Sequence, residues 1–254
     1  MTVEEKIACL ETKTAVPRLS IPDAGSSEGL HGLVQSGGFG GPAIPTTTFP
    51  EVIGLAATWN PELIRRVAAV EADEARYISQ SPKYKHNVLV LWGPNADLAR
   101  DPRWGRNNES YGEDPFFDGT MAAAFVRGLQ GDHPRYWKTA SLVKHFLANS
   151  NETTRGGSSS DFDERLFWEY YSVPFRMAFE QGGAKSLMAS YNAWNHVPMT
   201  VNSILRDIAV KQWGVDGILS ADATAVEQLG TATNTSKISK RRWRRRSKQA
   251  LDRS

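Results

Sequence analysis

The fold of this chain is most constrained by an alternation of short apolar runs with longer segments of helical spacing. Four apolar runs are interpreted as buried strands, at residues 87–92, 141–143, 186–189 and 217–220. Helices are predicted from Pro61, behind the N-cap residue Asn60, and over residues 116–129, 163–181 and about 202–213. Such an alternation predicts a parallel sheet with helices packed outside it.

Polar side chains follow the ends of these strands. They are the segment 95–106, the pair Lys144 and His145, the pair Tyr191 and Asn192, and Asp222. In an α/β barrel the carboxyl ends of all strands converge on one mouth, where active sites lie. A nucleotide-binding sheet is less well supported, because the sequence has no Gly-x-Gly-x-x-Gly after a strand and no Gly-Lys-Ser/Thr. The sequence therefore predicts an α/β fold of the (β/α)8 barrel type.

Charge is distributed unevenly along the 254 residues. The formal net charge is +2, but residues 237–254 carry nine Lys or Arg and one Asp, which leaves residues 1–236 at −6. This acidic body gives no reason to expect a nucleic-acid partner, and only the basic tail would favour one. No apolar run approaches the ~20 residues that span a bilayer, so no membrane partner is expected.

Several kinds of chemistry are disfavoured by what the sequence lacks. The five His are scattered, no His-Glu-x-x-His occurs, and one Cys cannot build a zinc cluster, so we expect no metal or other cofactor. Gly-x-Ser-x-Gly, the serine-hydrolase elbow, is also absent. Met1 leads into a polar stretch rather than a secretory leader, so the default expectation is a cytoplasmic chain.

Asp222 stands just after the apolar strand at 217–220. A carboxylate there would lie at the mouth of a barrel, partly shielded from water, as a catalytic nucleophile requires. The alternative is an N-cap for a helix that begins near Ala223, and capping is a common duty of Asp. From position alone, capping is the commoner of the two roles.

The other polar positions also have two interpretations each. Lys144 and His145 could hold sugar hydroxyls or tune a carboxylate, or could be an exposed Lys beside a hydrogen-bonded His. The loop at 100–110 offers Arg side chains and Trp104 to a polyol, or is held together by its own Arg–Asp pairs. Glu28, in a polar loop at 26–32, could accept hydrogen bonds from sugar hydroxyls, although a solvated surface Glu is the commoner case.

These motifs, taken together, resemble the N-terminal barrel domain of glycoside hydrolase family 3, which contains β-glucosidases, β-xylosidases and related exo-acting enzymes. The most specific segments are Arg100 to Pro115 (RDPRWGRNNESYGEDP) and Val143 to Phe146 (VKHF), and Gly217 to Asp222 follows them in the expected order. Further matches are Val16 to Pro22, Glu28 to Gly32, and Thr48 to Pro50 with Leu55 to Trp59. The likeness runs from Met1 to about Leu229.

The resemblance implies roles for individual residues. Asp222 matches the carboxylate nucleophile of the family, which follows an apolar strand that ends in a small residue. The positions that line the sugar-binding subsite are matched by Glu28, Arg106, Lys144, His145 and Tyr191. The mechanism implied is double displacement with retention, in which a second carboxyl group about 5–5.5 Å away acts as acid and then as base.

The sequence departs from the family pattern in three places. The acid/base usually comes from a following α/β sandwich domain, and residues 147–153 lack the His-containing loop that one branch uses instead, so no acid/base is assigned. An aromatic or small polar residue commonly follows the nucleophile, whereas Ala223 stands here. The last barrel strand and helix are replaced by a basic segment.

We therefore expect residues 1–230 to form a barrel domain that is incomplete at its C-terminal end. Residues 231–254 are expected to be a disordered basic tail foreign to the family, and a frameshift or truncated reading frame is favoured over a nucleic-acid-binding or nuclear-import arm.

Three functional hypotheses follow. The first is an exo-acting, retaining β-glycosidase that removes terminal β-D-glucosyl or xylosyl residues through a covalent glycosyl-Asp intermediate. Its substrate would be a β-linked oligosaccharide or an aryl or alkyl β-glycoside. The second is an inactive, truncated remnant that binds sugar without turnover. The third, a nucleic-acid binder that uses the basic tail, is the most distant.

Overall fold

A computed structural model describes residues 1–9, 15–35 and 43–231 of the chain. The basic segment from residue 232 onward lies outside the described residues, so the predicted division into a domain and a disordered tail remains a prediction. No helix of the described part is both long and apolar enough to cross a membrane.

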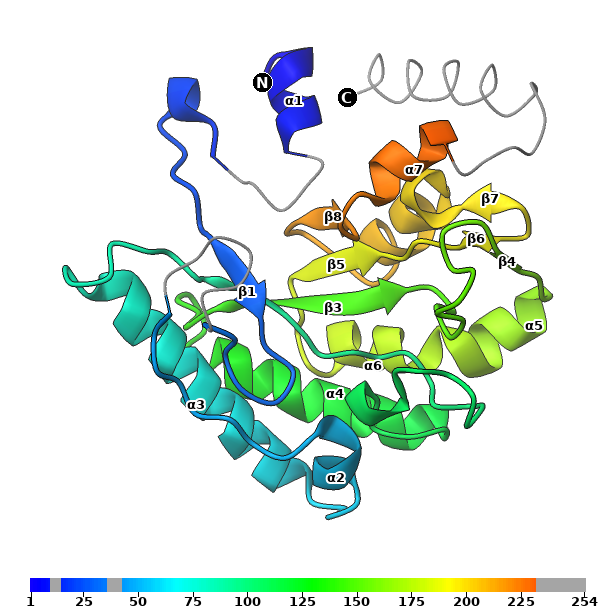
Figure 1. Cartoon of the computed structure of the whole chain (residues 1–254), viewed down its shortest axis with the longest axis horizontal. Helices are drawn as coiled ribbons and strands as arrows, with labels where there is room; N and C mark the ends of the chain where they lie inside the picture. Colours follow the sequence, from blue (N-terminus) through cyan, green and yellow to red (C-terminus); the bar gives the residue numbers. More distant parts are fainter. Residues whose placement is uncertain (10–14, 36–42, 232–254) are drawn as a thin grey trace.

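The main sheet is parallel throughout and curls into part of a barrel (Figure 1). Its strands, in spatial order, are β1 (Ser26–Glu28), β2 (Val90–Trp92), β3 (Ala140–Phe146), β5 (Ser186–Ala189) and β8 (Leu219–Ala221). Because every pair of neighbouring strands in this sheet is parallel, all their carboxyl ends lie at the same edge of the sheet. This incomplete α/β barrel confirms the predicted fold class.

Three helices cover the outer face of this sheet: α3 (Pro61–Gln80), α4 (Pro115–Gln130) and α6 (Val173–Glu180) (Figure 1). Asn60 and Asp114 cap the first two, because their side-chain oxygens accept the amide hydrogens of Leu63 and Phe117 at 3.0 and 2.7 Å. Proline occupies the first helical position of both, where its missing N–H is not needed.

Side chains alternate between the two faces of the sheet and build two cores. Leu91, Val143 and Leu187 face outward and pack beneath the helices in the large hydrophobic core. Val90, Leu142 and Met188 face the inside of the curl and form a smaller cluster. The strands that appear in the sequence as continuous apolar runs are therefore buried on both faces, as is typical of parallel sheets.

The remaining elements are short. They are α1 (Val3–Ala8), α2 (Val52–Ala56), α5 (Glu164–Leu166), α7 (Ala225–Thr231), β4 (Ser159–Ser160), β6 (Ala193–Trp194), β7 (Val197–Pro198), and single 3-10 turns at Pro17–Leu19, Asn107–Glu109 and Met199–Val201. Strands β4, β6 and β7 form a small separate sheet beside the carboxyl end of the main one (Figure 1).

The structure corrects three sequence-based expectations. Residues 26–28 are a strand and not a loop, because they pair in register with β2, with Glu28 opposite Trp92. The helix expected over 163–181 is interrupted by a π-helical stretch at Phe167–Tyr171, since Pro174 has no N–H to donate to the carbonyl four residues earlier. The helix expected over 202–213 is π-helical at Leu205–Val210.

Candidate active site

The predicted site residues come together at the carboxyl end of the curled sheet. Glu28 is the last residue of β1, Lys144 and His145 lie in β3, Tyr191 follows β5, and Asp222 directly follows β8. Arg106 lies in the long segment between β2 and α4. Strand order alone brings these positions to one mouth, as the barrel interpretation predicted.

Asp222 is held by its backbone and leaves one carboxylate oxygen free. Its amide donates to the carbonyl of Ala189 at 2.9 Å, and Oδ1 accepts the amide hydrogen of Ala223 at 2.8 Å. Oδ2 is buried and has no hydrogen-bond partner among the described residues. The carboxylate contacts an amide that precedes α7 rather than one within that helix, so the geometry does not support the helix-capping alternative.

His145 lies between two carboxylates. Its Nδ1 is 2.9 Å from Asp97 Oδ2, and its Nε2 is 3.8 Å from Asp222 Oδ2 and 3.3 Å from Arg106 Nη1. Burial, together with the cations of Arg106 and Lys144, holds the pKa of His145 well below its usual value. We assign a neutral ring whose Nδ1–H donates to Asp97 and whose Nε2 accepts from Arg106.

Lys144 and Glu28 form an ion pair across 116 residues of sequence. The Lys144 side chain is 1% exposed, whereas that of Glu28 is 33% exposed. An exposed Lys, the alternative interpretation from sequence, is therefore wrong. The register of β3 against β5 shifts between Val143 and Phe146, and this irregularity lets both Lys144 and His145 reach the mouth although they are adjacent.

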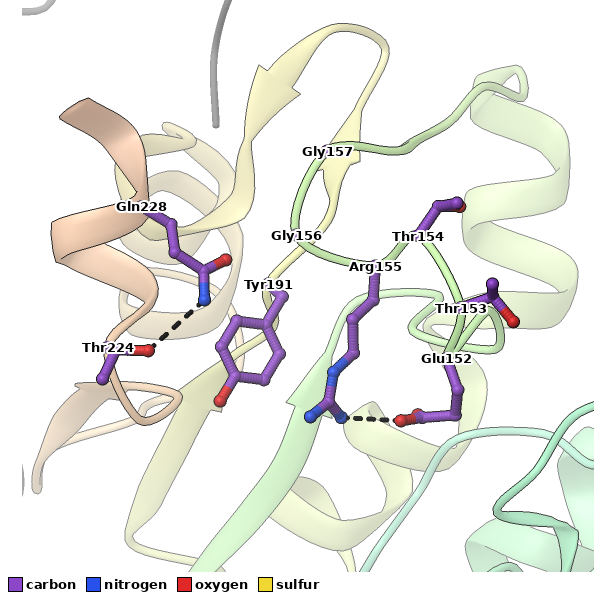
Figure 2. Close-up of a pocket in the computed structure, with 9 residues that line it drawn as sticks. All are labelled: Glu152, Thr153, Thr154, Arg155, Gly156, Gly157, Tyr191, Thr224 and Gln228. Carbon is purple, nitrogen blue, oxygen red and sulfur yellow. Dashed lines mark hydrogen bonds and ion pairs between the residues drawn. The ribbon is translucent and has the colours of Figure 1, made fainter. Parts of the chain in front are cut away.

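A second set of contacts joins Arg106 to Tyr191. Arg106 donates two hydrogen bonds to Glu109, at 2.9 and 2.6 Å, and its Nη1 lies 3.9 Å from Glu152 Oε1. Glu152 also pairs with Arg155 at 2.8 Å, and the Arg155 guanidinium lies 4.4 Å from the centre of the Tyr191 ring (Figure 2).

The hydroxyl of Tyr191 reaches the chain next to Asp222. It donates to the carbonyl of Ala223 at 2.6 Å. Burial and the negative charge of Asp222 raise the pKa of Tyr191 to about 12. Tyr191 is therefore a neutral hydrogen-bond donor at physiological pH.

The loop at 100–110 is held together by its own Arg–Asp pair, as one interpretation from sequence expected, and it also directs Arg106 toward the site. Two hydrogen bonds from the Arg103 side chain to the Asp101 carboxylate stabilise the loop, while Arg106 contacts His145 in the site. Trp104 is buried, at 5% exposure, and its Nε1 donates to Glu152 at 3.4 Å. The indole therefore packs within the protein, and the expectation that it stacks on a sugar is not supported.

Three residues of the site were missed from sequence: Asp97, Glu152 and Arg155. Their importance comes from contacts between distant residues, such as Asp97 with His145, Glu152 with Arg106, and Arg155 with Tyr191. The available signal for Asp97 was its position in the polar segment behind β2. For Glu152 and Arg155 the only signal was that opposite charges stand three positions apart, a spacing that is common for surface ion pairs. In the described ranges, no group of three His, Cys, Asp or Glu could hold a metal ion.

The curled parallel sheet, with its carboxylates, cations and imidazole at one mouth, defines an α/β-barrel protein whose polar site lies at the strand ends. Residues 1–251 match the glycosyl hydrolase family 3 N-terminal domain, and the chain belongs to this family.

Similar proteins carry two kinds of name. Probable β-D-xylosidase 7 of Arabidopsis thaliana is 34% identical over 254 residues, which cover 93% of this chain and 33% of that protein. A β-glucosidase of Rhizobium radiobacter is 34% identical over 228 residues, which cover 87% and 26%. The chain therefore spans about a third or less of the length of these relatives.

Solved structures of similar fold carry the same two names. A GH3 exo-β-xylosidase (XlnD), in complex with a xylobiose aziridine probe, superposes with a TM-score of 0.80 at 27% identity, covering 93% of this chain and 32% of that one. A β-glucosidase from Kluyveromyces marxianus in complex with glucose gives 0.76 at 31% identity, covering 89% and 26%.

Proposed function

We propose that this site cleaves terminal β-D-glucosyl or β-D-xylosyl residues with retention of configuration, with Asp222 as the nucleophile. The observation that carries the proposal is Asp222 Oδ2, which is buried at the mouth and has no hydrogen-bond partner in the described part of the chain. Oδ1 is meanwhile fixed by the Ala223 amide. A carboxylate anchored through one oxygen, with the other free, can attack an anomeric carbon without first breaking a contact.

The surrounding groups suit a ligand with several hydroxyl groups. Lys144 and Arg106 can donate to sugar hydroxyls, and the Glu28 carboxylate, a third exposed, can accept from them. The neutral ring of His145 stands 3.8 Å from Asp222 without neutralising it. We therefore assign Glu28, Arg106, Lys144, His145 and Tyr191 to the subsite that holds the sugar to be transferred.

In this mechanism Asp222 Oδ2 forms a bond to the anomeric carbon while the bond from that carbon to the leaving oxygen breaks. The leaving oxygen takes a proton from an acid, which then deprotonates the water that hydrolyses the glycosyl-Asp ester. We assign the acid/base role to no residue of this chain. Glucoside and xyloside both remain in the proposal, because relatives of both names match.

The proposal is tested with 2,4-dinitrophenyl β-glucoside and β-xyloside, whose leaving group hardly needs protonation. The native chain should release dinitrophenolate, and Asp222→Ala should lower the rate on the order of 10³-fold or more. Asp216→Ala, which changes an exposed Asp ahead of the same strand, is the matched control and should retain the native rate.

Far-ultraviolet circular dichroism establishes that each variant is folded. Absence of release from a folded native chain that still binds D-glucose or D-xylose would overturn the proposal and support a sugar-binding chain without turnover.

A further inference from the structure

A patch of aromatic and basic side chains lies at the amino end of the main sheet, at the opposite edge from Asp222. The segments that enter β2, β3 and β5 are residues 81–89, 131–139 and 181–185. Because these strands are parallel neighbours, the three segments lie at one edge of the sheet, away from β4, β6 and β7 (Figure 1). We call the surface formed by these segments and the end of α3, residues 73–80, the amino-end patch.

Four aromatic rings belong to this patch. Tyr77 is 65% exposed, and its ring lies edge-on to that of Tyr84 with the centres 6.2 Å apart. Tyr136 and Trp137 are 66% and 41% exposed. Large aromatic side chains that gather on one exposed surface indicate a binding surface, because a solvated surface gains nothing from them.

Contacts between α3 and the segment 131–139 join the rings into one surface. Arg76, the neighbour of Tyr77, donates to the backbone carbonyl of Trp137. Lys138, the residue after Trp137, pairs with Asp73 of α3 at 2.6 Å. The ring of Tyr77 and the ring of Trp137 are therefore held on the same side of the molecule.

Cations accompany these rings. A positive group lies 4.7 to 5.5 Å from the centre of three of them: Lys83 over Tyr84, Arg135 over Tyr136, and Lys185 over Trp137. Such contacts hold a positive charge beside the apolar face of a ring. The patch therefore presents apolar and cationic groups in alternation.

Most of this positive charge is available to a ligand. Lys83, Lys85 and Arg135 are exposed, and no carboxylate of the described residues lies within ion-pair distance of them. Lys185 differs, because it pairs with Asp216 at 3.2 Å. Three cations without a counter-ion, beside exposed rings, suit an anionic ligand that also has apolar faces.

We infer that the amino-end patch binds a polysaccharide that carries uronic-acid carboxylates, at a place separate from Asp222. The rings pack against the C–H faces of pyranose units, and the unpaired cations bind carboxylates spaced along the polymer.

The charges of the patch favour such a polymer over a nucleic acid. A nucleic acid carries a phosphate at every nucleotide. Those phosphates would meet three exposed carboxylates on or beside the patch, those of Asp73, Asp132 and Asp216. A polysaccharide with widely spaced uronic acids avoids this repulsion. The choice of a sugar polymer over an acidic polypeptide rests on the proposed function, because a glycoside-cleaving chain acts on sugar polymers.

The test is a pair of calorimetric titrations on the full chain carrying Asp222→Asn, which prevents turnover. The ligands are glucuronoxylan and the same polymer after its carboxyl groups have been reduced to alcohols. Both offer the same xylosyl ends to the site at Asp222, so a difference between them reports on the carboxylates alone. We expect glucuronoxylan to bind about ten-fold more tightly, since exposed charge pairs contribute modestly each, and we expect added salt to narrow the gap.

A charge variant tests whether the patch causes this difference. It replaces the three unpaired cations together: Lys83→Gln, Lys85→Gln and Arg135→Gln. The control replaces three exposed cations outside the patch: Arg66→Gln, Arg165→Gln and Lys211→Gln. The charge variant should bind both polymers equally, whereas the control, with the same net charge, should keep the native gap.

A ring variant tests the apolar part of the patch. Tyr136→Ala should weaken the binding of both polymers about five-fold, because the ring serves either polymer. Trp59→Ala is the matched control, since Trp59 is 75% exposed but lies at the opposite end of α3, and it should weaken neither. Far-ultraviolet circular dichroism establishes that each variant is folded.

The other outcomes overturn the inference. Equal affinity of the unmodified patch for the two polymers would show that carboxylates are not recognised. A gap that persists in the charge variant would assign the recognition to other cations, such as those of residues 237–254. Tighter binding of poly(U) than of glucuronoxylan, lost in the charge variant, would make the patch a nucleic-acid surface. None of these readings depends on hydrolysis, so dinitrophenolate release by the native chain still decides the proposed function separately.

Discussion

Asp97 Oδ2 lies 2.9 Å from His145 Nδ1, although the two residues are 48 positions apart. Asp97 Oδ2 also lies 3.2 Å from the backbone nitrogen of His145, and Asp97 Oδ1 accepts the amide hydrogen of Asn149 at 3.2 Å. Asp97 thus holds the ring and the backbone of the β3 end together. The opposite ring nitrogen of His145 is thereby aimed at Asp222 and Arg106.

Asp97→Asn should loosen this part of the site. The carboxylate of Asp97 accepts hydrogen bonds through both oxygens, whereas an amide has one oxygen and one NH₂ group. At least one N–H group that now donates to Asp97 would therefore face a donor in the variant. We expect the free energy of unfolding to fall by about 2–3 kcal/mol, measured by urea denaturation at pH 7, and D-xylose or D-glucose to bind about ten-fold more weakly. Asp101→Asn, at an Asp whose Arg partner is exposed to solvent, should cost much less. Equal losses in the two variants would contradict this role for Asp97.

The Lys144–Glu28 pair should respond asymmetrically to the loss of either partner. Glu28→Gln leaves the ammonium group of a 1% exposed Lys144 without its counter-ion, at a cost of about 3–5 kcal/mol. Lys144→Met leaves a carboxylate that is 33% exposed and that water can solvate, so it should cost less. In the double variant, at least about 2 kcal/mol of the Glu28→Gln loss should return.

Urea denaturation of the four chains at pH 7 gives the complete thermodynamic cycle. A Glu28→Gln variant as stable as Lys144→Met would show that Lys144 does not depend on this carboxylate.

Glu71, on α3, should make stability fall as pH rises. Burial raises the pKa of Glu71 to about 8, against the opposing effect of the nearby Gly32 amide, and neither carboxylate oxygen has a hydrogen-bond partner within the described part of the chain. Between about pH 4.5 and pH 8, Glu71 is therefore protonated in the folded protein, whereas in the unfolded chain, where its pKa is near 4.5, it is ionised. Stability should decline from about pH 4.5 to about pH 8 and level off above.

Glu71→Gln should remove this decline, since glutamine stays neutral throughout. The difference between variant and native chain, measured by urea denaturation, should be small at pH 5 and reach a few kcal/mol at pH 8.5. Glu62→Gln, an exposed position on the same helix, is the control and should follow the native pH dependence. A native-like decline in Glu71→Gln would assign the effect to another group.

Gly128 should be required for the close approach of α3 and α4. A Cβ at this position would lie 2.2 Å from the carbonyl oxygen of Arg65 and 2.6 Å from the Cβ of Ala68. Gly128→Ala should therefore lower the free energy of unfolding by about 1–3 kcal/mol, despite the better helix propensity of alanine. Gly54→Ala, in α2, has no neighbour nearer than 4.0 Å in the described residues and should gain about 0.5–1 kcal/mol. Thermal denaturation should therefore show a lower melting temperature than the native chain for Gly128→Ala and a higher one for Gly54→Ala.

Much of the framework was predictable because its signals are local. The caps at Asn60 and Asp114, the prolines that follow them and the apolar strand runs depend on interactions between residues a few positions apart. The placement of polar residues at strand ends follows from the same pattern, since parallel strands share a carboxyl edge. That is why the sequence pointed to Asp222 and to the pair Lys144–His145.

Other features depend on partners that only the curled sheet supplies. Residues 26–28 became a strand through pairing with β2, and the burial of Lys144 became tolerable through Glu28, 116 residues away. Trp104 is buried through its contact with Glu152, and Asp97 holds His145. Both contacts join segments that are distant in the sequence.

The amino-acid sequence alone thus determined the alternation of strands and helices, the edge of the sheet where polar residues gather, and several of the polar residues that lie there. Only the tertiary structure decided which oxygen of Asp222 is free, which groups hold His145, and which guanidinium lies over the Tyr191 ring. The physical reason is that local propensity acts over a few residues. The pairing and solvation of buried polar groups are set instead by distant segments that meet when the sheet curls.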